Sequence, residues 1–203
     1  MAVTSAYLFV TLTYQMNLAH NLICSSDRWA RRVQRDLIPW GLEGVELGDD
    51  VLEIGPGFGA TTRLLARRAP KLSVLELSPR YCEQLRAALG NTVEVTQGDA
   101  TQLPYPGGRF SAVVCFTMLH HIDPPALQDR AFAEVARVLR PGGAFAGTDS
   151  LRAGRLFKLI HVGDSLALID PDGLPGRLGS AGLRRPRVDR SERSLRFRAY
   201  RAA

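Results

Sequence analysis

The chain has 203 residues, 45% hydrophobic and 23% charged, which is the composition of a single globular domain with its own core. Its formal net charge is +6, it contains no apolar run of membrane-spanning length, and its start lacks the basic region of a secretory signal. Three widely spaced cysteines (Cys24, Cys82 and Cys115) form no CxxC pair, so we expect no disulfide framework, no metal site and a cytoplasmic location.

Residues 1–41 are predicted to form an N-terminal helical flap. The first fifteen residues precede any amphipathic pattern, and we expect them to be disordered or to lie upstream of a translation start at Met16. The sequence SSD at 25–27 is typical of a helix start, and Pro39 and Gly41 are expected to end that helix. Its apolar stripe, at helical spacing, consists of Trp29, Val33 and Leu37.

Residues 42–203 are predicted to form an α/β domain in which strands and helices alternate. The expected strands are 51–54, 72–77, 93–95, 112–116 and 144–147, and the expected helices are 61–69, 79–89 and 126–139. Short loops between alternating elements favour a parallel sheet with helices on both faces. A less regular stretch at 151–182 is interpreted as a substrate-side insertion, and two closing strands follow near 186–190 and 194–200.

Three glycines follow the first predicted strand, one at every second position. In VLEIGPGFGATT, Gly55, Gly57 and Gly59 allow the backbone to approach a ligand closely. The spacing is GxGxG, whereas the dinucleotide fingerprint is GxGxxG, and the acid Glu53 would sit badly beside a pyrophosphate. The acid suits an ammonium group or a bound water. By itself, the loop can equally be a tight turn without a ligand.

Two further acids follow the next strands. Glu76 ends the second strand, 21 residues after Gly55, where a carboxylate accepts hydrogen bonds from ribose hydroxyls. Asp99, in GDATQLP after the third strand, can recognise an adenine edge together with a backbone N–H. Each acid also has a simpler interpretation, a helix cap for Glu76 and a turn for Asp99. At three consecutive strand ends, the signals strengthen one another.

With these motifs in order, the sequence resembles the class I S-adenosylmethionine-dependent methyltransferases, and among them the type-11 small-molecule group. The matching segments are VLEIGPGFGATT, VLELSPRYCEQLR, GDATQLPYPGGRFSAVVCFTMLHHI and RVLRPGGAFAGTDS, over about residues 48–150. The resemblance implies a Rossmann-like, doubly wound sheet of seven strands, mostly parallel with an antiparallel last strand and helices on both faces. It also implies S-adenosylmethionine as the methyl donor.

The resemblance further implies a role for each matching residue. The methionyl amino end would lie at Glu53, Gly55, Gly57 and Gly59. The ribose hydroxyls would bind Glu76. The adenine would meet Leu77, Asp99 and the Ala100 N–H. The methionyl group would lie near Thr117, with Met118 and His120 at the mouth of the pocket.

The acceptor is expected to be a small molecule attacked at an oxygen, nitrogen or carbon atom. His120 is the candidate general base, although it and His121 can equally line the pocket and cap the next helix. Substrate contacts are expected from His121, from Asp149 after the fifth strand, and from Trp29 of the flap, with His20 and Tyr14 as further flap candidates. We expect a monomer or homodimer, and no metal.

Two other activities compete with this interpretation. The segment EIGPGFG also resembles ribosomal RNA adenine dimethylases, but those enzymes carry an Asn-Pro-aromatic motif after the fourth strand, where this chain has FTMLHHI. A nicotinamide-dependent oxidoreductase is opposed by the glycine spacing and by the order of the four motifs, and Glu76 argues against a phosphorylated dinucleotide. A cofactor-binding protein without catalysis also fits the motifs.

The C-terminal region carries the whole net charge. Eight arginines and two acids follow residue 183, which equals the +6 of the chain. Such a tail can bind nucleic acid, but residues 195–200 alternate between apolar and basic, as in a strand with one buried face. Arginine on the solvent side of an edge strand also discourages edge-to-edge pairing. The pattern therefore disfavours nucleic acid as a partner.

Overall fold

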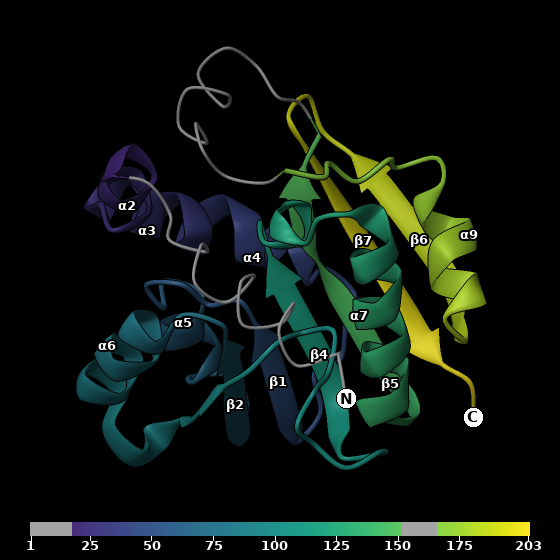
Figure 1. Ribbon diagram of the computed structural model, residues 1–203, viewed down its shortest axis with the longest axis horizontal. Helices are drawn as coiled ribbons and strands as arrows, with labels where there is room; N and C mark the ends of the chain where they lie inside the picture. Colours follow the sequence, from purple (N-terminus) through teal and green to yellow (C-terminus); the bar gives the residue numbers. More distant parts are fainter. Residues whose placement is uncertain (1–17, 152–165) are drawn as a thin grey trace, which may run out of the picture.

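The computed structural model describes residues 18–151 and 166–203, and these form a seven-stranded sheet of order β3-β2-β1-β4-β5-β7-β6 (Figure 1). The strands are β1 (Asp50–Ile54), β2 (Lys71–Glu76), β3 (Glu94–Gln97), β4 (Phe110–Phe116), β5 (Leu139–Ser150), β6 (Leu183–Arg190) and β7 (Ser194–Arg201). Strands β1 to β5 pair in parallel, and β7 is antiparallel to both β5 and β6. The predicted doubly wound sheet with an antiparallel last strand is confirmed.

The order of the strands creates a switch point beside β1. The chain moves outward from β1 to β2 and β3, and then returns to place β4 and β5 on the other side of β1. Ligands of open α/β sheets bind at such a point, beyond the carboxyl ends of the strands. The carboxyl ends of β1 to β5 all meet at one edge of the sheet, which we call the carboxyl edge.

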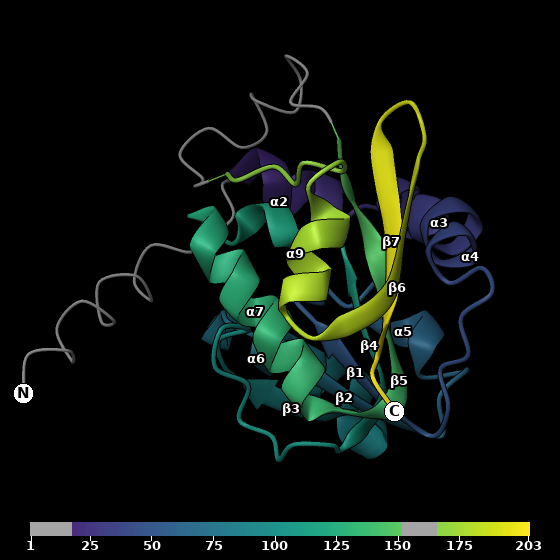
Figure 2. The same ribbon diagram turned by 90° about the vertical axis from the view of Figure 1, so that its right-hand side faces the viewer.

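Helices cover both faces of the sheet, which Figure 2 shows nearly edge-on. One face packs against α7 (Pro125–Val138) and α9 (Leu174–Ser180), through side chains such as Phe132 and Leu178. The other packs against α5 (Thr62–Leu65), α6 (Pro79–Leu89) and the helices before β1. The central strands are buried on both sides, and β1 has no exposed residue. Two short 3-10 turns, Gly90–Thr92 and Leu119–His121 (η3), complete the loops.

The helices before β1 differ from their predicted form. After α2 (Leu18–Cys24), α3 (Asp27–Arg32), the π-helix η1 (Val33–Leu37) and α4 (Ile38–Gly41) follow one another without a break. The Ile38 N–H donates to the Val33 carbonyl, five residues back, so the wider turn directly precedes Pro39, which has no N–H to donate. Pro39 therefore lies within the helix, and the prediction that it ends the helix was wrong. The predicted helix start is confirmed, because Ser26 Oγ accepts from the Trp29 N–H at 3.2 Å.

One strand and one helix also differ in length from the prediction. Strand β5 spans twelve residues instead of the four predicted, because Leu139 already pairs with Phe110 and the Pro-Gly-Gly run lies inside the strand. Gly142 has a φ of 75°, a left-handed conformation that glycine adopts without a steric cost. Helix α5 is shorter than the predicted 61–69.

The arginine-rich strand is not at the edge of the sheet. Strand β7 lies between β5 and β6, so the expectation of an edge strand was wrong. Its solvent-side arginines bind neighbouring segments instead: Arg196 donates to the Trp40 carbonyl at 2.9 Å and to the Asp189 carboxylate at 2.7 Å, and Arg198 donates to the Glu43 carbonyl at 3.0 Å. These arginines attach the segment after α4 to the sheet.

Some expectations concern residues outside the described ranges. Tyr14, Met16 and the first fifteen residues lie there, as do the apolar residues at 156–160 of the predicted insertion. Within residues 18–151 and 166–203, no helix combines the length and the apolar character that a membrane crossing requires.

Candidate functional site

The three acids predicted at strand ends lie together along the carboxyl edge. Glu53 is the fourth residue of β1, Glu76 is the last residue of the neighbouring β2, and Asp99 follows β3 by two residues. Glu53 and Glu76 are 1% and 4% exposed. Their charges interact, since the Glu76 carboxylate contributes to a raised pKa of Glu53.

The glycine loop joins the ends of β1 and β2. Gly55, Gly57 and Gly59 have φ values of 68°, 54° and 75°, so all three occupy the left-handed region. The Gly57 N–H donates to Glu76 Oε2 at 3.1 Å, and the Ser78 N–H donates to Glu76 Oε1 at 2.9 Å. One carboxylate thus fixes the loop against the start of α6, and each of its oxygens retains acceptor capacity, since an ionised carboxylate accepts about four hydrogen bonds.

Glu53 is a buried carboxylate with one oxygen left unsatisfied. Its Oε1 accepts a short hydrogen bond from the Thr61 hydroxyl, while Oε2 has no hydrogen-bond partner among the described residues. Burial raises the pKa of Glu53 to about 7, opposed in part by the threonine hydroxyl. A buried, unpaired acceptor of this kind is costly, and a cationic donor placed against Oε2 would remove that cost.

The Asp99 segment forms the turn that the simpler interpretation predicted. Asp99 Oδ1 accepts from the Thr101 N–H at 2.8 Å. The adjoining Ala100 is buried, and Leu77 after β2 is half-buried. The turn occupies one Asp99 oxygen and therefore orients the carboxylate beside Ala100.

The loop after β4 carries backbone strain beside the glycines. Thr117 has a φ of 52°, which is unfavourable for a β-branched residue, and its N–H donates to the Thr148 carbonyl at 2.7 Å. The next side chain, Met118, lies against Gly55: a Cβ built on Gly55 would come within 3.0 Å of three of its carbon atoms. No sequence signal predicted the strain at Thr117. The strained loop and the glycine loop are in direct contact.

His120 and Asp149 form a buried pair. His120 Nδ1 lies 2.5 Å from Asp149 Oδ1, and the His120 backbone N–H lies 3.3 Å from Asp149 Oδ2. Asp149 is 0% exposed and lies within β5 instead of after it, which corrects its predicted place, and its carboxylate faces His120. The His121 ring lies against the His120 ring, with centroids 4.1 Å apart.

Gln128 was missed by the sequence analysis. This residue of α7 is fully buried, and its Nε2 donates to the Leu119 carbonyl at 3.1 Å and to the Ala167 carbonyl at 2.7 Å. The Ala167 N–H donates in turn to the His120 carbonyl at 2.8 Å. Gln128 therefore connects α7, the histidine turn η3 and Ala167 within the predicted insertion. In the sequence it looks like one more polar residue on a helix.

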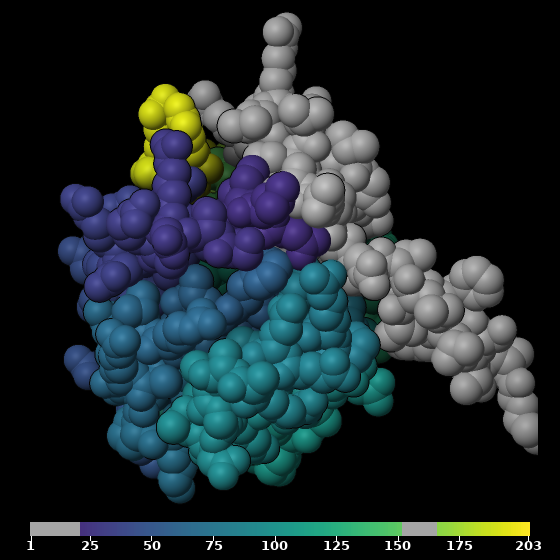
Figure 3. Space-filling model, turned by 90° about the vertical axis from the view of Figure 1, so that its left-hand side faces the viewer, coloured from purple at the N-terminus to yellow at the C-terminus, as the bar shows by residue number. Residues whose placement is uncertain are grey.

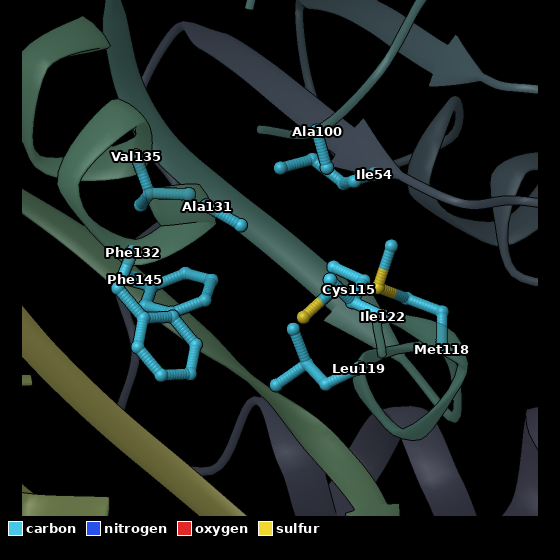
Figure 4. Close-up of a pocket in the computed structure, with 10 residues that line it drawn as sticks. All are labelled: Ile54, Ala100, Cys115, Met118, Leu119, Ile122, Ala131, Phe132, Val135 and Phe145. Carbon is cyan, nitrogen blue, oxygen red and sulfur yellow. The ribbon is translucent and has the colours of Figure 1, made fainter. Parts of the chain in front are cut away.

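Apolar side chains pack closely around a small pocket beside Leu119 of the histidine turn (Figure 4). Ile54 and Ala100 line one side of it, Met118 and Cys115 another, and α7 contributes Phe132. Burial and the carboxylates of Asp149 and Glu53 raise the pKa of the Cys115 thiol well above its ordinary value. The Cys115 thiol is thus close enough to both buried carboxylates for their charges to affect its pKa. The low dielectric around these carboxylates strengthens the polar interactions that they make.

The described part of the predicted flap, residues 18–41, lies over the α5 and α6 side of the carboxyl edge (Figures 1 and 3). Asn21 Oδ1 accepts from the Tyr81 hydroxyl of α6 at 2.6 Å, and the Tyr81 ring lies 4.9 Å from that of Phe58 in the glycine loop. Trp29 is partly buried and packs against the core cluster on this face, with Arg32 over its ring. The side chain of His20, a predicted flap contact, lies outside the described part of the chain.

The three cysteines are free, and Cys82 and Cys115 are buried as packing residues. Burial raises the pKa of Cys24 to about 12. In the part of the chain that the structure describes, His, Cys, Asp and Glu side chains form no group of three that could hold a metal ion.

Comparison with known proteins shows which known domain residues 51–143 resemble. A family model described as a methyltransferase domain matches residues 51–143. An uncharacterized methyltransferase of Mycobacterium tuberculosis is 35% identical over 127 residues, which cover 63% of this chain and 49% of that protein. A fatty-acid O-methyltransferase of Mycolicibacterium smegmatis is 39% identical over 108 residues, covering 51% and 38%. A probable ribosomal RNA small subunit methyltransferase A of Pyrococcus abyssi is 40% identical over 85 residues, covering 40% and 31%.

Solved structures with a similar fold include methyltransferases. The phosphoethanolamine N-methyltransferase 2 of Haemonchus contortus, solved in complex with S-adenosylmethionine, superposes with a TM-score of 0.70 at 15% identity, covering 91% of this chain and 56% of that one. The chain spans about half the length, or less, of the curated relatives it matches. Residues 51–143 thus match a methyltransferase domain, and the sheet around them has a fold that solved methyltransferases share.

Proposed function

We propose that the protein transfers a methyl group from S-adenosylmethionine to an oxygen, nitrogen or carbon atom of a small molecule. The observation that carries this proposal is the unsatisfied Oε2 of Glu53, buried beside three left-handed glycines. The α-ammonium group of the methionyl end supplies the cationic donor that this oxygen lacks. A pyrophosphate would place negative charge against the same carboxylate.

The neighbouring residues fit the rest of the ligand. Glu76 already accepts two backbone N–H groups and has acceptor capacity for the two ribose hydroxyls. Asp99, oriented by its turn, would take the adenine edge together with the Ala100 N–H, with Leu77 against the ring. The glycine backbone would surround the amino-acid end, and Thr117 would lie near it.

Bound S-adenosylmethionine supplies a methyl group that is already activated on a sulfonium sulfur. The residues of the chain therefore contribute mainly positioning and exclusion of water. Trp29, His121 and the 151–182 segment are proposed to contact the acceptor, and the flap formed by residues 1–41 is proposed to cover the site. The three free thiols support a cytoplasmic location for the protein, since such thiols persist in reducing compartments.

An RNA adenine methyltransferase is the alternative that one relative supports, because the ribosomal RNA methyltransferase of Pyrococcus abyssi matches 85 residues. A flipped base is held by stacking on aromatic side chains and by hydrogen bonds to its edge. The loop after β4 offers Thr117, Met118 and Leu119 instead of an amide and an aromatic ring. Arg196 and Arg198 of the basic strand already bind the segment after α4. A small molecule is therefore the better candidate.

Calorimetric titration of the full chain with S-adenosylmethionine and with NADH tests the proposed donor. We expect binding of the first and no binding of the second, and the reverse result would favour the oxidoreductase. Tritiated methyl donor, offered with a metabolite extract or with total RNA in parallel, then tests the acceptor class. Label in the small-molecule fraction supports the proposal, whereas label confined to RNA would contradict it.

A further inference from the structure

The buried pair of His120 and Asp149 has the arrangement of an oriented base. Asp149 Oδ1 lies 2.5 Å from His120 Nδ1, and the same oxygen accepts from the Ser150 N–H at 2.6 Å. Asp149 Oδ2 faces the His120 backbone N–H at 3.3 Å. Both side chains are buried, at 3% and 0% side-chain exposure. A carboxylate held by two backbone groups and aimed at Nδ1 places the ring proton on Nδ1, so that Nε2 carries the lone pair.

This pair lies on the cofactor side of the molecule. His120 belongs to the same loop as Met118, whose side chain lies against Gly55 of the glycine loop. Gln128 and Ala167 hold that loop through its carbonyl groups at Leu119 and His120. The position of the histidine is thus fixed from β5, α7 and Ala167 of the 151–182 segment.

The charges around the pair disfavour an anionic acceptor. Asp149 on β5 lies against His120 Nδ1, and the adjacent His121 ring lies against the His120 ring, while the carboxylates of Asp149 and of Glu53 on β1 both act on the Cys115 thiol of β4. The charges that act on the Cys115 thiol are the two carboxylates, and no arginine or lysine of the described residues acts on it. A substrate carboxylate would meet like charges in a region of low dielectric.

We infer that Asp149 is a positioning residue that orients His120 as a general base, and that the acceptor attacks through a hydroxyl or amine group that must lose a proton. This inference rests on the proposed methyltransferase function. As the acceptor oxygen or nitrogen forms its bond to the methyl carbon, the carbon–sulfur bond breaks with its electron pair left on sulfur. The acceptor proton passes to Nε2 of His120, and the positive charge of the imidazolium is stabilised by Asp149.

The tautomer of His120 is the first test, and it requires no acceptor and no bound donor. Nitrogen NMR of the ¹⁵N-histidine-labelled full chain at pH 8, with the His120 signals assigned through His120→Gln, distinguishes the two neutral tautomers. We expect a proton on Nδ1 and none on Nε2. A proton on Nε2, with or without one on Nδ1, would overturn the inference.

Two substitutions separate positioning from cofactor binding. Asp149→Asn and His120→Gln are each expected to lower methyl transfer into the metabolite extract by about 100-fold or more, while the Kd for S-adenosylmethionine changes less than about threefold. Their combination is expected to be no slower than His120→Gln alone, because both act through one proton transfer. Asp49→Asn, at an exposed position before β1 and at the opposite edge of the sheet, is the matched control and keeps the wild-type rate. Parallel loss of cofactor affinity and transfer rate would indicate a structural role instead.

The chemical stability of the product tests the acceptor class. Methyl esters of carboxylates release methanol in mild alkali, whereas methyl ethers and N-methyl groups do not. We expect the label transferred by the wild-type chain to survive mild alkali. Alkali-labile label would overturn the inference and leave the methyltransferase proposal intact. Failure of the wild-type chain to bind S-adenosylmethionine would contradict the proposed function, while the tautomer still decides the state of His120.

Discussion

The two halves of the carboxyl edge are built in different ways. On the donor side, Glu53, Gly57 and Glu76 lie within 24 positions of one another, and short local motifs place them. On the acceptor side, the contacts join distant segments: 29 residues separate His120 from Asp149, and 39 separate Gln128 from Ala167. The donor side can therefore be read from motifs, while the acceptor side depends on how β4, β5 and α7 pack. Substitutions on the two sides should affect different measurements.

Loss of Glu76 should have the largest effect, and only on the donor side. Glu76→Ala is expected to weaken S-adenosylmethionine binding by about 100-fold or more, because two hydrogen bonds to a charged group are lost at about 1.5–3 kcal/mol each. Calorimetric titration measures this loss, and a thermal unfolding curve confirms that the variant is folded. The exposed Glu83→Ala in α6 is the control. An unchanged Kd for Glu76→Ala would show that Glu76 does not bind the ribose hydroxyls.

Glu53→Gln should weaken donor binding and stabilise the unliganded protein. The pKa of Glu53 is raised to about 7 by burial, so the folded state binds a proton more tightly than the unfolded state. This group therefore lowers the unfolding free energy as the pH rises from about 4.5 to about 7, by about 3 kcal/mol in total. Glu53→Gln should remove that loss above pH 7 and leave stability below pH 5 nearly unchanged.

Glu53→Gln should also change how the affinity for S-adenosylmethionine depends on pH. In the wild-type chain, S-adenosylmethionine affinity should fall by about fivefold between pH 7 and pH 6, because the ammonium group requires the ionised carboxylate. In Glu53→Gln the affinity should be lower, by about 10- to 100-fold at pH 8, and nearly independent of pH. Urea unfolding and calorimetry at pH 5, 6, 7 and 8 measure both effects. A variant with lower stability and unchanged affinity would refute the role of Glu53.

Gln128→Leu tests the acceptor side alone. The substitution leaves the Ala167 carbonyl without its side-chain donor and the Leu119 carbonyl with the Ile122 N–H alone, which costs about 1–3 kcal/mol of unfolding free energy. Methyl transfer should fall with the loss of the histidine turn, while the Kd for S-adenosylmethionine stays within about threefold of the wild-type value. The exposed Gln84→Leu in α6 is the matched control. An equal loss of donor affinity would show that the two sides are not separate.

The smallest effect is expected at the flap. Tyr81→Phe removes the hydrogen bond to Asn21 and nothing else, at a cost of about 0.5–1.5 kcal/mol. The core should unfold at nearly the same temperature, while limited proteolysis around residues 18–26 becomes faster. If cleavage there is unchanged, then the Tyr81 hydroxyl does not hold the flap in place.

Prediction from the sequence succeeded where a local pattern determines a local structure. The alternating strands and helices and the start of α3 follow from periodicity and capping, and the Rossmann-like sheet was implied by the resemblance. Prediction failed where contacts between distant segments determine the structure. Strand β5 begins at Leu139 because that residue pairs with Phe110, and β7 lies inside the sheet because β6 covers its outer edge. Pro39 continues a helix because the π-turn before it adapts the backbone.

The candidate site divides in the same manner. The positions of Glu53 and Glu76 at neighbouring strand ends were predicted, whereas their roles toward the donor stay predictions. His120 and Asp149 were each singled out, but as a base and a separate substrate contact, because nothing in the sequence shows that β4 and β5 bring them within hydrogen-bond distance. Gln128 and the strained Thr117 carry no sequence signature at all, since burial and backbone conformation are properties of the folded chain.

The most direct test of the account is a crystal structure of the full chain with S-adenosylhomocysteine, which keeps the amino-acid end and the adenosine but lacks the methyl group. We predict that the α-ammonium group donates to Glu53 Oε2 and that both ribose hydroxyls donate to Glu76. The adenine should lie beside Leu77, Asp99 and Ala100. A ligand bound elsewhere, or one with its adenosine at the glycine loop, would contradict it.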